Sequence, residues 1–483
     1  MLYSNPEFFL LFGVTLALFL WLESYRARFA LLLAASLVFY AWAGLFDFAV
    51  YLFVVTVSWT AVALARRHPA RKSGLLTAGI TIMALHLFFW KYASWAASQV
   101  QLLWPSFLGG RTLSLPLPIG ISFFTLQGIA YLADFSHDDA EYMALPTYLL
   151  FKSFFAQLVA GPIVRASQLL PQLRRLERPS PRLLSAGLSL FVYGFFKKLV
   201  VADGVTPFVD PVFANPSRYG RGALLLALLG YTAQIWADFS GYTDMGRGAA
   251  KMLGIELPEN FLSPYLSRSP SEFWRRWHIT LSEWIRDYVF TPLALGGSLG
   301  VFTCMIVSMG LCGLWHGAQW HYVAWGLYHG LLLVAQRRLS WDWGWTRLSS
   351  RALDLLHGAA TLSAVVFGWL IFRAEGFSAI GAFLRGLLRG GGGAAPSGAG
   401  AVLLSLAFCA MAQWLPYYDL ETETHPIADR LSGWAARRGL LGDGGALERP
   451  VAGFGLGAAL AAALVAAIVL RQTNMRAFIY FQF

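Results

Sequence analysis

The sequence predicts an all-α membrane protein with a single integral-membrane domain over residues 1–483. Of its 483 residues, 57% are hydrophobic and only 13% are charged, which is too apolar for an ordinary soluble domain. The apolar residues gather in runs close to the ~20 residues that a helix needs to cross a bilayer. We expect about eleven to thirteen transmembrane helices, with amphipathic and broken helices around a central buried chamber.

The apolar runs can be followed from one end of the chain to the other. They lie near residues 8–22, 29–45, 48–65, 75–95, 147–164, 184–200, 222–240, 301–314, 353–372, 399–416 and 452–470. Prolines and glycines in 115–141 predict a broken helix, and the same residue types in 203–222 and 389–400 predict loops. Residues 417–450 form a polar connection whose role the sequence leaves open.

The net charge of +11 is explained by membrane topology. Basic residues occur in short clusters between apolar runs, as in 65–72, without the extended basic face of a nucleic-acid-binding protein. The positive-inside rule places these clusters in the cytoplasm, together with Arg471 and Arg476, and places the N-terminus outside. No cleavable signal peptide is evident, so we expect the first span to be retained.

One basic tract allows a second interpretation. It contains Arg165, Arg174, Arg175, Arg178 and Arg182. It either reflects topology alone or forms a docking face for an acidic acyl carrier or for the phosphates of an acyl coenzyme.

The sequence offers no metal-binding or nucleotide-binding motif. Cys304, Cys312 and Cys409 all lie in apolar runs, without CxxC or Cys/His spacing, so we expect small core residues and neither a disulfide nor zinc. A P-loop, a Rossmann fingerprint and a GxSxG nucleophile elbow are likewise missing from the sequence.

The most informative stretch runs from Ser271 to His329. Wound as one helix, 271–293 would bury a face that carries His278 and expose the opposite, charged face. The buried face comprises Trp274, Trp277, His278, Leu281, Trp284, Ile285 and Tyr288, and the exposed face comprises Arg275, Arg276, Glu283, Arg286 and Asp287. His316 follows the apolar run 301–314 and lies at membrane depth, where an ionisable residue is a functional candidate.

Long motifs in this order resemble the membrane-bound O-acyltransferases, specifically the bacterial branch containing alginate O-acetyltransferase. They are FFAQLVAGPIVRASQLLPQL, DFSGYTDMGRG, PENFLSPYLSRSPSEFWRRWHITLSEWIRDYVFTPL, GLWHGAQW, FGWLIFRAE and FIYFQF. The resemblance implies an acyltransferase core over about residues 115–375 with additional C-terminal helices in 399–470. It also implies that His316 matches the family's catalytic histidine and His278 a second histidine shared within this branch.

Two regions qualify this resemblance. Where relatives usually carry Tyr-Arg shortly after the position of Asp134, this chain has Ser136-His137, so a role for that arginine is in doubt. Asp134 itself is interfacial or functional. Asp238, Tyr242 and Asp244 gather at what we expect to be a helix end, where an Asp-Arg pair with Arg247 would brace the chamber rather than take part in chemistry.

The residues permit acyl transfer to a hydroxyl. Imidazole suits the base that takes the alcohol proton, so His316 is our candidate general base, and a transient acetyl-histidine remains open. We expect His278 to orient the acyl thioester, Trp277 and Trp315 to wall the site, and Arg275 and Arg276 to meet donor phosphates or lipid headgroups.

These observations favour an O-acetyltransferase of the bacterial inner membrane that acts on an alginate-like or cellulose-like exopolysaccharide. The resemblance implies no bound cofactor, an acyl thioester such as acetyl-CoA as donor, and a periplasmic partner that finishes transfer to the polymer. Alternatives within the family are another acyl group or acceptor, such as peptidoglycan or D-alanine for teichoic acid. A transporter or flippase with a polar path through Asp238, His278 and His316, or a scaffold, are alternatives from other classes.

Overall fold

The protein is an all-α membrane protein over the part of the chain that the computed structural model describes, residues 1–158, 161–339, 350–390, 393 and 396–414. Five described helical stretches are long and apolar enough to cross a membrane: Leu45–Arg67, Pro69–Leu103, Pro181–Ala214, Arg221–Met252 and Arg351–Arg373. Three shorter apolar helices are Pro6–Trp21, Val301–His316 and Ala399–Trp414. The expected total of about eleven to thirteen spans stays a prediction, because the polar connection 417–450 and the apolar run 452–470 lie outside the described residues.

The helices follow the apolar runs of the sequence closely in the first quarter of the chain. The main elements up to the centre are α1 (Pro6–Trp21), α2 (Tyr25–Ala41), α3 (Leu45–Arg67), α4 (Lys72–Leu103), α5 (Ile121–Ser136), α6 (Leu145–Ser153), α7 (Phe155–Leu158), α8 (Ala166–Leu173), α9 (Pro181–Phe196), η3 (Lys197–Ala202), α10 (Asp203–Ala214) and α11 (Arg221–Met252). They are followed by α12 (Pro270–Arg276), α13 (Ile279–Ile285), η6 (Arg286–Phe290), α14 (Thr291–Leu295), α15 (Val301–His316), α16 (Trp320–Arg338), α17 (Ser350–Arg373), α18 (Phe377–Arg389) and α19 (Ala399–Trp414).

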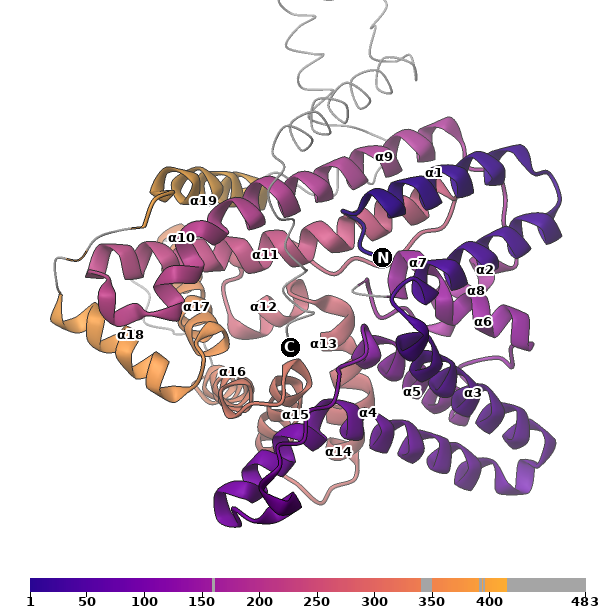
Figure 1. Ribbon diagram of the computed structural model, residues 1–483, viewed down its shortest axis with the longest axis horizontal. Coiled ribbons are helices and arrows are strands. Elements are labelled where there is room, and N and C mark those ends of the chain that lie inside the picture. Colours follow the sequence, from indigo (N-terminus) through magenta and orange to yellow (C-terminus); the bar gives the residue numbers. More distant parts are fainter. Residues whose placement is uncertain (159–160, 340–349, 391–392, 394–395, 415–483) are drawn as a thin grey trace, which may run out of the picture.

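The short helices α12 and α13 occupy the middle of the molecule (Figure 1). The long helices α9 and α11 run side by side along one flank, and α15 and α16 pack as a pair on the other side of the centre. Helices α3, α4 and α5 form a third group. Residues of α5, α11 and α16 contact this central stretch.

The expected span 147–164 is wrong as one continuous helix. The backbone turns at Phe154 (φ −47°, ψ 109°), which separates α6 from α7. Side chains replace the helical hydrogen bonds there: Phe155 N donates to Ser36 Oγ at 3.3 Å, and the Gln157 amide donates to Phe151 O. A break inside a membrane protein requires such internal partners, because lipid supplies none.

The expected loop at 203–222 is also wrong, since its first half is helix α10. Pro207 and Pro211 lie on the exposed side of this helix. Val205, Phe208 and Val209 are buried and give the helix an apolar stripe with helical spacing. Burial of that stripe against α11 outweighs the two lost backbone hydrogen bonds.

Helix α11 continues through the Asp238–Gly248 motif, where the sequence predicted a helix end. The glycines of this motif permit close packing instead of breaking the helix: a Cβ at Gly194 of α9 would lie 2.4 Å from Gly241 O. The charges are neutralised by lysines between α9 and α10. Lys198 Nζ lies 2.7 Å from Asp238 Oδ1, and Lys197 pairs with Asp244.

Candidate active site

The central stretch breaks at His278, so the single amphipathic helix predicted over 271–293 is wrong. Trp277 is extended, and His278 adopts the left-handed conformation with φ 43° and ψ 55° between α12 and α13. The predicted burial pattern is nevertheless confirmed for Trp274, Trp277, His278, Leu281, Trp284 and Ile285, whereas Tyr288 is half-buried.

An adjacent segment imposes this break. Leu262 N donates to Arg276 O at 2.9 Å, and Ile279 N donates to Asn260 O at 3.0 Å. The Asn260 side chain accepts hydrogen bonds from Thr280 N at 3.1 Å and from Thr280 Oγ1 at 2.7 Å. A left-handed conformation at a non-glycine residue costs free energy and is retained where surrounding contacts fix it, commonly at functional sites.

His278 is fully buried in an aromatic setting. Its ring centroid lies 4.6 Å from that of Phe239 on α11, in an edge-to-face arrangement. Phe123 on α5 lies at 6.4 Å and Trp315 on α15 at 5.8 Å. Three helices from different parts of the chain therefore hold this imidazole away from solvent.

His316 is the last residue of α15 and is 3% exposed. Its ring centroid lies 4.9 Å from that of Trp315, 5.0 Å from that of Trp325 and 5.2 Å from that of Phe372. The Trp315 indole thus contacts both His316 and His278. The structure brings together the two histidines singled out from the sequence, and both contact the same tryptophan.

The close crossing of α15 and α16 fixes the backbone that carries His316. A Cβ at Gly313 would lie 2.1 Å from Tyr322 O and 3.0 Å from Gly326 N. Both of these neighbours are backbone atoms, so a side chain at Gly313 must push the helices apart. Gly310, one turn earlier, faces only the flexible end of Leu327, at 3.2 Å.

We therefore expect Gly313→Ala to destabilise the protein by about 1–3 kcal/mol and to lower its activity by displacing His316. Gly310→Ala is the matched control on the same helix and should change both quantities much less. Membrane abundance and thermal unfolding in detergent measure the first effect. Equal behaviour of the two variants would contradict the close-packing argument.

The other sequence-predicted residues fall into two groups. Trp277 is buried beside the histidines, with its ring 4.8 Å from that of Trp369 and 4.9 Å from that of Phe261. The remaining residues make bracing or surface contacts. Asp238 and Asp244 pair with Lys198 and Lys197, Tyr242 stacks on Tyr3 at 4.4 Å, Arg276 pairs with Glu272 at 2.9 Å, and Arg275 is exposed. The expected Asp244–Arg247 pair is present at 3.9 Å, but the lysine is the closer partner.

Sequence reasoning missed a third buried histidine, His329 on α16. Its ring lies 4.9 Å from that of Trp325, which also contacts His316. Trp325 and His329 are four residues apart and therefore share one helix face. This spacing, on the helix that follows the WHG motif, is the sequence signal that could have identified His329.

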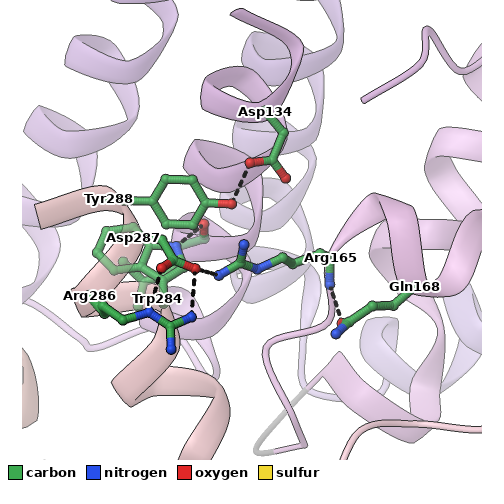
Figure 2. A network of polar contacts seen from close by, with 8 residues as sticks. Asp134, Arg165, Gln168, Trp284, Arg286, Asp287 and Tyr288 are labelled. Atoms are coloured by element: carbon green, nitrogen blue, oxygen red, sulfur yellow. Dashed lines mark hydrogen bonds and ion pairs between the residues drawn. The ribbon is translucent and has the colours of Figure 1, made fainter. Parts of the chain in front are cut away.

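A polar network ties the central stretch to α5 and α8 (Figure 2). Tyr288 donates a 2.5 Å hydrogen bond to Asp134, and Asp287 pairs with both Arg165 and Arg286. Partial burial raises the pKa of Asp287, but hydrogen bonds from Arg286 and Arg165 outweigh it and hold that pKa below its usual value. Asp134 and Arg165 are thus engaged within the protein.

The described residues include no cluster of three or more His, Cys, Asp or Glu side chains that could hold a metal ion. Cys304, Cys312 and Cys409 are buried, as predicted for core residues. A candidate site built from imidazole and indole groups is suited to moving a proton and orienting an apolar acyl group.

Comparison with known proteins agrees with this arrangement. A model of the membrane-bound O-acyltransferase family matches residues 118–350, which include His278 and His316. The chain is 37% identical over 387 residues to the probable alginate O-acetylase AlgI of Pseudomonas putida, covering 77% of each protein. The corresponding protein of Pseudomonas aeruginosa is also 37% identical, over 77% of this chain and 72% of its own length.

A more distant relative is the peptidoglycan O-acetyltransferase of Helicobacter pylori, 34% identical over 62% of each protein. The histidine motifs, the helical membrane fold and these matches agree with one another. The chain belongs to the membrane-bound O-acyltransferase family.

Proposed function

We propose that the protein passes an acetyl group across the bacterial inner membrane for O-acetylation of an alginate-like or cellulose-like exopolysaccharide. The acyltransferase activity follows from the family, and the acceptor is inferred from the alginate O-acetylases to which the chain is 37% identical. The donor is an acyl thioester such as acetyl-CoA. A periplasmic acetyltransferase completes transfer to the polymer.

The observation that carries this proposal is the pair of buried histidines that both contact the Trp315 ring. His316 acts as general base and takes the proton of the attacking hydroxyl group. A C–O bond forms at the acyl carbon, the C–S bond breaks, and the proton passes to the leaving thiolate. His278 orients the thioester, while Trp277 and Trp315 exclude water.

A charged residue would be a poor replacement for either imidazole. Aromatic rings surround both, so the site provides few groups that could solvate a permanent charge. A neutral imidazole can accept a proton in such surroundings without first releasing one. This supports a base over a fixed electrostatic role.

The test is complementation of a strain that lacks the gene. The wild-type chain should restore O-acetyl groups on the exported polymer, and His316→Ala should not, at equal membrane abundance. Normal acetylation with His316→Ala would remove this residue from the mechanism. Restored acetylation of peptidoglycan instead of exopolysaccharide would favour the acceptor of the Helicobacter pylori relative.

A further inference from the structure

A lysine of α4 contacts the end of the helix that carries His316. The ammonium group of Lys91 donates to Trp315 O and, at 3.1 Å, to Ser122 Oγ on α5. The neighbouring Tyr92 hydroxyl donates to Leu314 O at 2.8 Å. Two consecutive residues of α4 thus bind the two carbonyl groups that precede His316.

These carbonyl groups need partners from outside their own helix. Helix α15 ends at His316, and Gly317 is extended with φ −173° and ψ 155°. The last carbonyl groups of a helix have no intrahelical donor, and leaving them unpaired in a buried region is costly. Lys91 and Tyr92 meet that requirement and thereby fix how the last turn of α15 is oriented.

Lys91 also contacts the Trp315 side chain. Its Nζ lies 5.6 Å from the centroid of the indole ring, within the range of a cation–π interaction. That indole contacts both His278 and His316. One side chain therefore holds both the backbone and the ring of the residue that contacts the two histidines.

Placing an ionisable side chain inside a membrane helix costs free energy, which argues that Lys91 is functional. Lys91 lies within a helix long and apolar enough to cross the membrane, where ionisable side chains are rare and mark functional sites. A neutral donor such as the hydroxyl of Tyr92 suffices for Leu314 O. At Trp315 the amine donates a hydrogen bond, and its protonated form adds an attraction to the negative end of the helix dipole and to the ring.

We propose that Lys91 is a positioning residue for acyl transfer, which holds Trp315 and His316 in their reactive arrangement. The inference rests on the proposed function and extends it to a helix outside the recognised motifs. Lys91 acts through Trp315 and need not touch the substrate.

The chain provides a matched control in Lys152 on α6. Its side chain is fully buried and donates to Phe124 O of α5, so it too is a lysine bound to a backbone carbonyl group. Its hydrogen bond is to α5 and not to α15. Replacing it removes a buried ammonium group without removing the support of the His316 turn.

The experiment compares Lys91→Met, Lys91→Arg and Lys152→Met in the full-length protein, with His316→Ala alongside. Polymer O-acetyl content, membrane abundance and the thermal midpoint in detergent are measured for each. We expect Lys91→Met to lower acetylation at least tenfold, because small displacements of catalytic groups cost about this much or more. Lys91→Arg should recover a large part, since guanidinium can still donate to Trp315 O.

Thermal midpoints distinguish a positioning role of Lys91 from a contribution to the stability of the protein. Methionine fills similar space and removes the cost of burying a charge, so Lys91→Met should unfold no earlier than Lys152→Met. The inference is overturned if Lys91→Met acetylates normally, if Lys152→Met loses as much activity, or if Lys91→Arg rescues nothing. Normal acetylation with His316→Ala would instead overturn the proposed function itself.

Discussion

Replacing Lys197 by methionine is expected to destabilise the protein by about 3–5 kcal/mol. Lys197 and Asp244 form an ion pair whose side chains are 0% and 2% exposed. Lys197 Nζ also donates to Ser240 Oγ at 2.9 Å and lies 4.7 Å from the Tyr193 ring centroid. Methionine would leave a buried carboxylate that has lost its closest positive partner.

A second substitution should reverse most of this loss. In Lys197→Met/Asp244→Asn neither side chain carries a charge, so the cost of an unpaired buried charge disappears. Lys72→Met serves as the surface control, because the carboxylate that pairs with Lys72 is 87% exposed and exposed pairs contribute about 0–1 kcal/mol. Membrane abundance and the thermal midpoint in detergent measure the stability of the single variant, the double variant and the surface control. Destabilisation of the double variant equal to or larger than that of the single variant would contradict the explanation.

The sequence predicts the spans well where one local signal decides the outcome. The apolar runs near 8–22, 29–45, 48–65 and 75–95 correspond to helices α1–α4, and the stretches that contain α3 and α4 are long and apolar enough to cross a membrane. The same signal places His316 at the end of α15. Motif spacing then associates His316 with His278, and the structure places both against Trp315.

Features that depend on distant partners were not predicted. The break at His278 requires Asn260 and Leu262, whose hydrogen bonds fix a backbone that the helical pattern of 271–293 does not anticipate. Helix α10 forms despite Pro207 and Pro211, because its apolar stripe packs against α11.

Lysines in apolar runs are the residues whose structural role the local sequence indicates least well. Lys197 and Lys198 lie at the end of the apolar run 184–200, where charged residues usually mark the end of a span, but both are buried and paired with Asp244 and Asp238. Lys91 passed unnoticed in the sequence, although its hydrogen-bond acceptor is the backbone beside His316. A charged residue in an apolar run therefore indicates a polar partner on another helix rather than the end of its own helix.

His316→Ala is expected to reduce acetyl transfer by roughly 10²–10⁴-fold, the usual contribution of a positioned general base. His278→Ala should also reduce the rate, because its ring contacts Trp315 and, in the proposed mechanism, orients the donor. The two residues are joined through one indole ring, so we expect them to act as a unit. Residues that act as a unit give strongly non-additive losses.

The double variant His278→Ala/His316→Ala should therefore be hardly slower than His316→Ala alone. Incorporation of labelled acetate into the exported polymer has the sensitivity to measure such low rates, with membrane abundance as the control. Losses that multiply in the double variant would mean that each histidine stabilises the transition state independently. In that case His278 would serve a separate step, such as receiving the acyl group before His316 passes it on, because independent steps contribute independent free energies.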